Sequence, residues 1–206
     1  MEVYLVRHGE TGGNIAHRHQ QEDTPLSGKG QRQAREVAEQ IKQLKPTHIV
    51  ASNLIRAIET ARIISEVCGL NLETNPRFIE LVRPDHMYGH YHKSFKSFWF
   101  YLQWYLGRGT NITSGGESYS DFRMRLQDAK ESISKYPKDA RVVIVSHAVF
   151  ISFFEAHLCN KRPVMPFKAI RIFYKLLTMS NTHITRLLYD KENGEGGCSW
   201  SLDKNK

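Results

Sequence analysis

The sequence has no uninterrupted apolar run that approaches the ~20 residues needed to span a lipid bilayer. Its N-terminal segment, Met1–Val6, lacks the basic stretch and the long apolar core of a secretory signal peptide. That segment has instead the composition of a short core strand. We therefore expect a cytoplasmic protein that does not bind to or cross a membrane.

Cysteine is scarce. The chain has three cysteines, Cys68, Cys159 and Cys198, which are odd in number and far apart. Such a set predicts neither a disulfide framework nor a zinc knuckle, and it is typical of a reducing compartment. The ten histidines show no convincing metal-ligand spacing. We therefore expect a chain that needs no metal and no cofactor.

The composition that remains is that of an ordinary globular protein, with 40% hydrophobic and 24% charged residues among 206. This length fits one domain, which we expect over residues 1–190. Residues 191–206 are polar and contain glycine, so we expect them to form a flexible C-terminal tail.

The formal net charge of +8 favours anionic partners. Charge alone does not separate nucleic acid from small phosphates, and a basic surface kept for solubility explains it equally well. No recognised nucleic-acid-binding motif occurs in the sequence, so we expect no nucleic-acid partner.

Strand-like and helix-like segments alternate along the chain. Ser52 is a candidate N-cap for one helix, and Gly69 a candidate for its C-terminal glycine. The alternation predicts an α/β fold, a three-layer αβα sandwich with a mainly parallel, doubly wound sheet. Expected strands are 1–6, 48–51, 70–73, 141–146 and 182–188, the last antiparallel at an edge; expected helices start near 27, 52 and 118, and 167–177 fits strand or helix.

Residues 83–114 break this alternation. They include seven aromatic side chains between Phe95 and Tyr105 and end in a glycine-containing stretch. We interpret the segment as a helical cap inserted over an edge of the sheet; an ordinary core helix is an equally good interpretation.

Two histidines follow strands that we expect to be buried. Arg7 and His8 end the first strand, and His147 ends the strand 141–146. Open parallel sheets bind ligands beyond the carboxyl ends of their strands, and Arg56, near the start of a helix at the same edge, can point there too. Arginine forks match phosphate oxygens, so the set suits a tetrahedral dianion.

This arrangement also suggests chemistry. Nearby arginines disfavour a positive charge on His8, which leaves a neutral imidazole nitrogen free to attack phosphorus. His147, protonated once phosphate is bound, would share the developing charge. Each residue also has a simpler explanation, because a single histidine after a strand is usually structural and a single arginine usually lies at the surface.

At this point the sequence resembles the histidine phosphatase superfamily, the phosphoglycerate-mutase-like enzymes, from Val3 to about Leu188. Five blocks occur in the family's order, and together they are far more specific than any one of them. They are Leu5–Thr11 (LVRHGET) with Asn14; Pro25-Leu26-Ser27 with Gly30 and Gln33-Ala34; Ser52, Leu54, Arg56-Ala57 and Thr60-Ala61; Gly115–Ser118; and Val145-Ser146-His147.

The resemblance implies that His8 is the phosphorylated nucleophile. It implies that Arg7, Arg56 and His147 hold the phosphoryl group with help from Asn14. The family's general acid is an acidic loop residue, and Glu80 matches its position best. Spacing alone does not single it out: Asp23, Asp85 and Glu117 remain candidates.

The sequence departs from the family's pattern around the leaving group. Gly13 replaces a common tryptophan, Ala148 replaces a common glycine, and the family's tryptophan-containing stretch after Glu80 is missing. We expect Gly9, Ala148 and Arg83 to bind substrate together with Asn14. Basic side chains would favour a second anionic group, although solvated lid residues explain them as well; they are Arg83, His86, His90 and His92.

The resemblance therefore predicts a metal-independent phosphatase that hydrolyses a small phosphorylated metabolite, as a monomer or a homodimer. Two alternatives stay open: a phosphoglycerate mutase-type phosphotransferase, and a non-catalytic module that binds phosphorylated ligands. The short segment between Asn14 and Leu26 favours the phosphatase, because it lacks the tryptophan-rich pattern associated with mutases.

Overall fold

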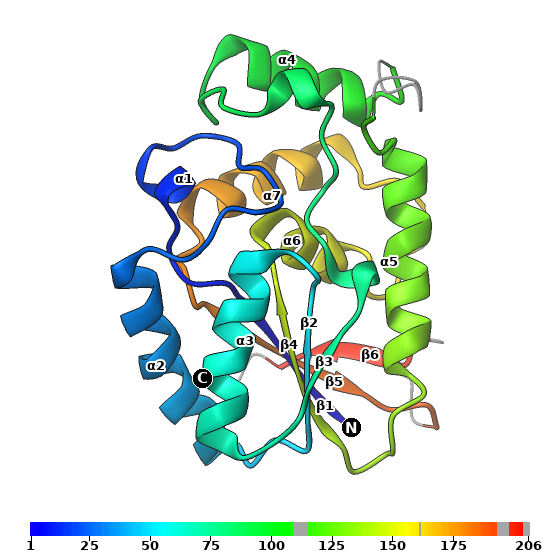
Figure 1. Ribbon diagram of the computed structural model, residues 1–206. Helices are drawn as coiled ribbons and strands as arrows, with labels where there is room; N and C mark the ends of the chain where they lie inside the picture. Colours follow the sequence, from blue (N-terminus) through cyan, green and yellow to red (C-terminus); the bar gives the residue numbers. More distant parts are fainter. Residues whose placement is uncertain (109–114, 161, 193–197, 204–206) are drawn as a thin grey trace.

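A six-stranded mixed sheet forms the centre of the protein (Figure 1). The structure is a computed structural model, and it describes residues 1–108, 115–160, 162–192 and 198–203. The strand order is β3-β2-β4-β1-β5-β6. The first four of these strands are parallel, and β5 and β6 are antiparallel additions at one side. The strands are β1 Glu2–Arg7, β2 His48–Ala51, β3 Leu72–Thr74, β4 Arg141–Ser146, β5 Ile184–Tyr189 and β6 Trp200–Leu202.

Helices cover both faces of this sheet, which confirms the expected αβα sandwich. Helices α2 and α3 lie against one face and α5, α6 and α7 against the other (Figure 1). The described helices are α1 Gly12–Ile15, α2 Gly28–Gln43, α3 Ile55–Cys68, α4 Phe95–Tyr105, α5 Tyr119–Ile133, α6 Ala148–Ala156 and α7 Pro166–Thr178, with short 3-10 turns η1 Pro76–Phe78 and η2 Asp85–Met87.

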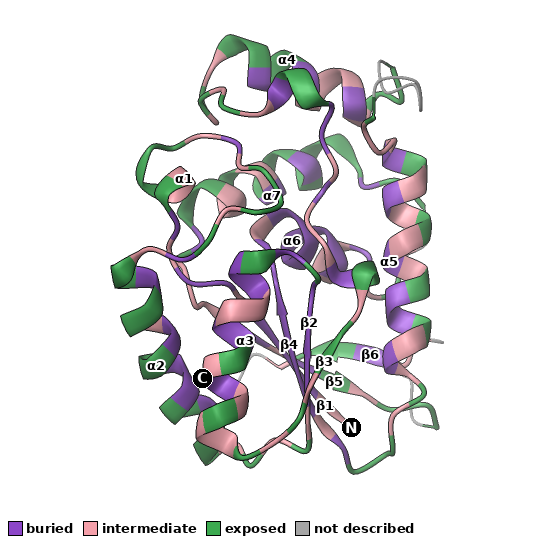
Figure 2. Cartoon of the chain, viewed as in Figure 1, coloured by how far each residue is buried: buried purple, intermediate pink, exposed green. Residues whose placement is uncertain are grey.

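Strand β1 shows why the sheet is buried on both sides. Its side chains alternate between two apolar clusters: Val3 and Leu5 pack with α5 and α6, whereas Tyr4 and Val6 pack with α2 and α3. Strands covered on both faces have near-continuous apolar sequences, as β1 and β4 do. Figure 2 shows these central strands as almost wholly buried.

Some local predictions were wrong. Ser52 does not cap α3, whose N-cap is Leu54; the Ser52 hydroxyl instead contacts the buried ring of His147. The ambiguous segment 167–177 belongs to helix α7. Strand β5 is antiparallel as expected, but β6 covers its outer side, so it is not the edge.

The aromatic segment between β3 and α5 rises above the carboxyl ends of the parallel strands. Helix α4 begins after Ser94, whose hydroxyl accepts a hydrogen bond from the Ser97 N–H. Helix α4 lies apart from the sheet, at the top of the molecule in Figure 1. It belongs to the segment that we expected to form an inserted cap. Residues 109–114 of the expected insertion lie outside the described residues.

The C-terminal segment differs from the expected flexible tail. Residues 200–202 form β6, and the Trp200 ring lies 4.8 Å from that of Tyr189 between ring centroids. A disulfide joins Cys159 to Cys198, with 5.2 Å between their Cα atoms. The prediction that the cysteines form no disulfide was therefore wrong, because spacing along the chain did not reveal that β6 returns toward the end of α6. The cysteines thus give no support for a reducing compartment.

Removing this disulfide should destabilise the fold. In the chain-entropy account, a cross-link between residues 39 apart in sequence stabilises by about 4 kcal/mol, because it restricts the unfolded chain. We expect Cys159→Ser to lower the free energy of unfolding in urea by up to that amount under oxidising conditions. Cys68→Ser, which removes the free cysteine, is the matched control. Equal unfolding midpoints for the two variants would contradict the pairing.

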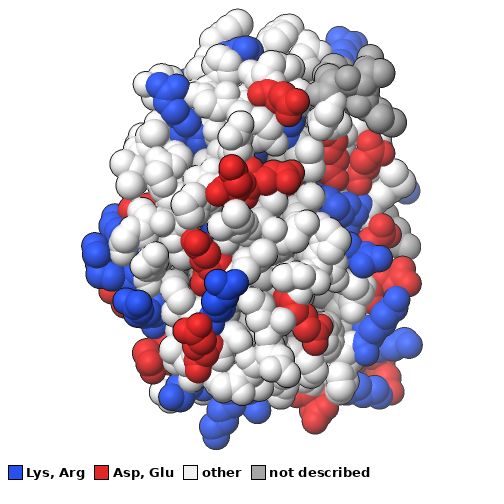
Figure 3. Space-filling model, in the orientation of Figure 1, with Lys and Arg blue, Asp and Glu red and all other residues white. Residues whose placement is uncertain are grey.

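The surface gives two further observations. On the face shown in Figure 3, lysine and arginine side chains are interspersed with aspartate and glutamate, and no single basic patch covers it. Among the described residues, no helix has the length and apolar content needed to cross a membrane.

Candidate active site

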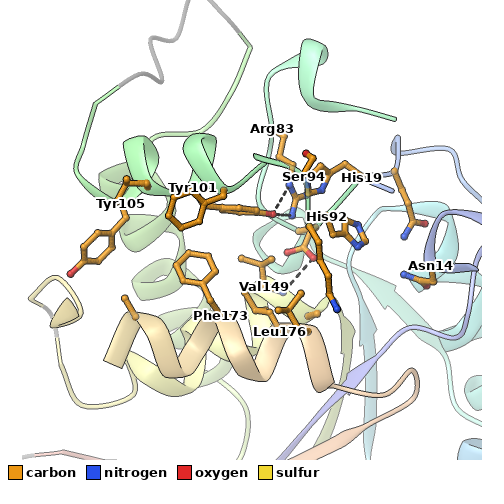
Figure 4. Close-up of a pocket in the computed structure, with 18 of the residues that line it drawn as sticks. Asn14, His19, Arg83, His92, Ser94, Tyr101, Tyr105, Val149, Phe173 and Leu176 are labelled. Atoms are coloured by element: carbon orange, nitrogen blue, oxygen red, sulfur yellow. Dashed lines mark hydrogen bonds between the residues drawn. The ribbon is translucent and has the colours of Figure 1, made fainter. Parts of the chain in front are cut away.

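A cavity of about 730 Å³ opens at the carboxyl ends of the parallel strands, below α4. Loops after β1 and β3, the first turns of α3 and α6, and the facing sides of α4 and α7 form its walls. Figure 4 shows polar side chains such as His19 and Asn14 on one side and aromatic rings on the other. The predicted residues that line it are Arg7, His8, Asn14, Arg56, Glu80, Arg83 and Ala148.

Strand register brings the two histidines together. Arg7 pairs with Ser146 at the end of the parallel β1–β4 ladder. The residues that follow them, His8 and His147, are therefore neighbours. The His8 N–H also donates to the Ser146 carbonyl at 3.0 Å. As a result, the two imidazole rings lie 5.2 Å apart between centroids.

The ring of His8 is fixed by its own loop. Its Nδ1 lies 2.7 Å from the carbonyl oxygen of Gly9, which can only accept a hydrogen bond. Nδ1 therefore carries the proton in the neutral ring. The Nε2 lone pair is left free, as a nucleophile requires.

Burial and neighbouring charges keep both imidazoles neutral. Burial, then the charges of Arg56 and Arg7, hold the pKa of His8 well below its usual range. Burial and the charge of Arg56 likewise lower the pKa of His147. Both rings are therefore unprotonated at neutral pH.

Several nitrogens around His8 make no hydrogen bond within the described chain. They are Nε of Arg7, Nε of Arg56 and Nδ1 of His147, and all three are buried. A buried polar atom without a partner costs roughly 1–3 kcal/mol, so such a cluster is rare unless it binds something. Of these residues, Arg7 and Arg56 line the cavity beside His8, and two guanidiniums there suit the oxygens of an anion.

Asn14 reaches the cavity from α1, and a residue that the sequence did not indicate holds it there. The Asn14 Oδ1 accepts hydrogen bonds from the Thr11 N–H and hydroxyl and from Asn181 Nδ2 at 3.1 Å. Its own amide NH₂ is thereby left for a ligand. Asn181 lies just before β5 and also donates to the His8 carbonyl at 3.1 Å.

We expect Asn181→Ala to lower the rate of any reaction at His8. The variant removes two donors that orient the loop of His8 and the Asn14 amide, and each such hydrogen bond is worth about 1 kcal/mol. The predicted change is roughly a tenfold fall in kcat/KM without loss of folding. Asn71→Ala, at an exposed position, is the control. Equal kinetics for both variants would show that Asn181 does not position the site.

Glu80 faces the cavity from the loop after η1. Its carboxylate accepts hydrogen bonds from the N–H groups of Val149 at 3.3 Å and Phe150 at 3.2 Å, in the first turn of α6. The other carboxylates that the sequence left open lie elsewhere. Glu117 forms an ion pair with Arg125 at 2.7 Å, and Asp23 and Asp85 are exposed and do not line the cavity.

Two of the predicted site residues, Gly9 and His147, do not line the cavity. Gly9 does not line the cavity, and its N–H donates to the Thr60 hydroxyl at 3.0 Å. Its role is steric, because a Cβ at Gly9 would lie 2.5 Å from the Gly30 carbonyl oxygen. His147 is fully buried behind His8, and its Nε2 lies 2.6 Å from the Ser52 hydroxyl. It does not line the cavity.

Arg83 is less available than expected. Its guanidinium donates to the Tyr101 hydroxyl at 2.8 and 3.1 Å and to the Leu81 carbonyl at 3.3 Å. Of the three histidines considered with it, His92 lines the cavity, while His86 and His90 do not. Sequence reasoning missed His19, which lies 4.7 Å from the His92 ring between centroids. It lies between two recognised blocks, Asn14 and Pro25, and belongs to neither, so the sequence gave no signal for it.

These buried histidines make stability depend on pH. Burial, then the charge of Arg83, lowers the pKa of His19 to about 2, whereas the unfolded chain has the ordinary value of 6.5. Below 6.5 the unfolded state binds a proton that the folded state does not, so the free energy of unfolding falls as the pH falls. His19→Gln should reduce this loss by about 1.4 kcal/mol per pH unit between pH 6 and 4. Urea titrations of this variant and of His86→Gln, at an exposed position, check it; parallel pH slopes would contradict it.

Comparison with known proteins identifies the family. The model of the histidine phosphatase superfamily (branch 1) matches residues 3–196. A probable phosphoglycerate mutase GpmB of Enterobacter sp. (strain 638) is 38% identical over 156 residues, which cover 72% of this chain and 70% of that protein.

Solved structures agree with the fold. The mycobacterial glucosyl-3-phosphoglycerate phosphatase in complex with VO3 superposes with a TM-score of 0.75 and 28% identity, over 98% of this chain and 97% of that one. A putative alpha-ribazole-5'-P phosphatase from Escherichia coli has a TM-score of 0.74 at 20% identity, over 98% and 95% of the chains, and shows the shared fold. The family model, the relative and the geometry around His8 agree: the chain belongs to the histidine phosphatase superfamily, branch 1.

Proposed function

We propose that this protein is a phosphatase that hydrolyses phosphomonoesters through a phosphohistidine on His8. The observation that carries the proposal is the cluster of buried, unpartnered nitrogens around the free Nε2 of a neutral His8. A similar structure is a phosphatase solved with VO3, a phosphate-like oxyanion, which fits a site that holds a tetrahedral or trigonal oxyanion.

In the first step, His8 Nε2 attacks phosphorus while the bond from phosphorus to the ester oxygen breaks. Arg7 and Arg56 hold the phosphoryl oxygens and stabilise the charge that spreads over them. Glu80, in its protonated form, donates its proton to the departing oxygen. The products are an alcohol and a phosphorylated His8.

In the second step, water replaces the alcohol. Glu80, now a carboxylate, accepts a proton from the water as its oxygen attacks phosphorus, and the bond from phosphorus to Nε2 breaks. Inorganic phosphate leaves and His8 is neutral again. His147 supports both steps from behind His8, because a dianion nearby favours its protonation and a charged ring would stabilise the transferred group.

A mutase would use the same first step but return the phosphoryl group to a second hydroxyl. The relative named as a probable phosphoglycerate mutase makes this the second candidate. Incubation with an aryl phosphate and, separately, with 3-phosphoglycerate distinguishes the two. We expect phosphate release from the aryl ester. Isomerisation of 3-phosphoglycerate without phosphate release would contradict the phosphatase.

We expect activity without any metal ion. The chemistry above uses arginines where metal-dependent phosphatases use cations, and those arginines would repel a cation. Dialysis against a chelator should leave kcat unchanged. Loss of activity on chelation and its return with zinc or magnesium would overturn this part of the proposal.

A further inference from the structure

The cavity extends well beyond the position of His8. Its long arm runs between α4 and α7, whose facing side chains form two walls (Figure 4). The Tyr101 and Phe173 rings meet across it, with 5.4 Å between centroids. A phosphoryl group fills only a small part of about 730 Å³, so most of the space is available to the rest of a ligand.

The walls of this arm are apolar. Among the described residues, none that α4 or α7 contributes is charged. The charged residues of α7, such as Lys168, Arg171 and Lys175, do not line the cavity, and Lys175 pairs with Glu155 at 2.5 Å. The wall residues are Phe98, Leu102 and Tyr105 of α4 and Ile170, Phe173 and Leu177 of α7.

Several of these side chains are exposed to solvent. Ile170 is 67% exposed, Phe98 62% and Leu177 57%. Contiguous exposed apolar surface is uncommon in soluble proteins and marks a binding site. Here it is continuous with the phosphoryl-binding end of one cavity, which identifies its occupant as the remainder of the molecule that carries the phosphate.

The polar groups lie on the opposite side of the cavity. His19, His92 and Ser94 lie between Arg83 and Asn14, on the side away from Tyr105 and Phe173 (Figure 4). Two cations line the cavity away from His8: Arg83, which donates three hydrogen bonds within the protein, and Lys93, which is exposed just before α4. An acidic leaving group would have to compete with Tyr101 for Arg83 and with water for Lys93.

We propose that the leaving group is an elongated, uncharged apolar alcohol, aryl or long-chain alkyl, which lies between α4 and α7. This inference rests on the proposed function for the reaction, but the binding of the apolar group does not. Transfer of each methylene from water into an apolar site favours binding about twofold to fourfold. The substrate class is therefore a phosphomonoester of an apolar alcohol rather than of a hydroxy acid.

The test uses n-alkyl phosphates from butyl to octyl, below their critical micelle concentrations, with 3-phosphoglycerate as the acidic comparison. We expect kcat/KM to rise about twofold to fourfold per methylene and to exceed that for 3-phosphoglycerate. The corresponding alkylphosphonates, which cannot be hydrolysed, report binding alone by calorimetry.

Two matched variants locate the effect. Ile170→Gln and Leu177→Gln replace exposed wall residues and should leave the fold intact. Each should lower kcat/KM for octyl phosphate about tenfold and change that for butyl phosphate little. Tyr174→Gln is the control, because Tyr174 is 71% exposed on the same helix but does not line the cavity.

The outcomes separate the two proposals. Hydrolysis that does not depend on chain length, or equal effects of Ile170→Gln and Tyr174→Gln, would overturn the apolar leaving group while the phosphatase stands. No hydrolysis of any ester, with phosphonate affinity that still rises with chain length, would overturn the phosphatase and support the apolar arm. If no ester is hydrolysed and phosphonate affinity does not depend on chain length, both proposals are overturned.

Discussion

Replacement of His8 by alanine should abolish turnover, with a fall in kcat of at least about 10⁴-fold. His8 is the group that makes the covalent intermediate in the proposed reaction, and no neighbouring side chain can replace its Nε2. Its ring is buried beside Arg7 and Arg56, which would still bind the phosphoryl group. The variant should therefore bind phosphate or vanadate with little change while releasing no product.

The control for this variant is His86→Ala, because His86 is exposed and outside the cavity. Phosphate release measured with an aryl phosphate should be normal for this control. If His8→Ala kept more than about a hundredth of the activity with its fold intact, the phosphohistidine route would be wrong. A water molecule attacking the ester directly would then be the better account.

Glu80→Gln should have the second-largest effect, and its size should depend on the leaving group. An amide cannot donate the proton that an alkoxide leaving group needs, so hydrolysis of an alkyl phosphate should slow about 10²-fold to 10⁴-fold. A nitrophenolate leaves without help, so the first turnover, which releases nitrophenol and phosphorylates His8, should slow much less. The later hydrolysis of the phosphohistidine also uses Glu80 and should slow for every ester, so burst-phase rates of the first turnover, for esters with different alcohol pKa values, measure this dependence.

Asp85→Asn provides the comparison for Glu80. Asp85 belongs to the same loop region but is exposed and does not line the cavity. Its replacement should leave both kinds of ester unaffected. An unchanged leaving-group dependence in Glu80→Gln, or the loss of alkyl phosphate hydrolysis in Asp85→Asn, would assign the proton transfer to another residue.

The central layers and the position of the cavity could be predicted because they depend on local patterns. Strands β1 and β4 are continuous apolar runs that end abruptly in Arg7-His8 and in His147. A parallel sheet places such strand ends at one edge, so both imidazoles were expected there; the pairing of β1 with β4 makes them neighbours. The regular spacing of apolar residues indicated α2 and α3 in the same way.

Features that depend on tertiary contacts were not predictable. The Ser52 hydroxyl had the sequence context of an N-cap but lies against His147, a residue 95 positions away. Asn181 orients the loop of His8 from the far end of the chain. The disulfide of Cys159 depends on strand β6, which pairs only because β5 offers it an edge. None of these contacts leaves a periodic signal in the sequence.

The cavity walls formed by α4 and α7 could not be predicted from the sequence either. Each helix has an apolar side with helical spacing, which by itself predicts burial in a core. Only the arrangement in space shows that part of each side remains exposed and lines the cavity instead (Figure 2). The aromatic residues near Phe98 stand out in the sequence, but their position opposite α7 is evident only in the structure.

The most direct test of a covalent intermediate on His8 is rapid quenching of the protein in alkali during turnover of an aryl phosphate, followed by peptide mass spectrometry. Phosphoryl groups on histidine survive alkali, whereas aspartyl phosphates do not. We expect one phosphoryl group per chain, on the peptide that contains residue 8, and its absence in His8→Ala. Steady turnover with no phosphorylated peptide, or with the label on another residue, would contradict the proposed mechanism.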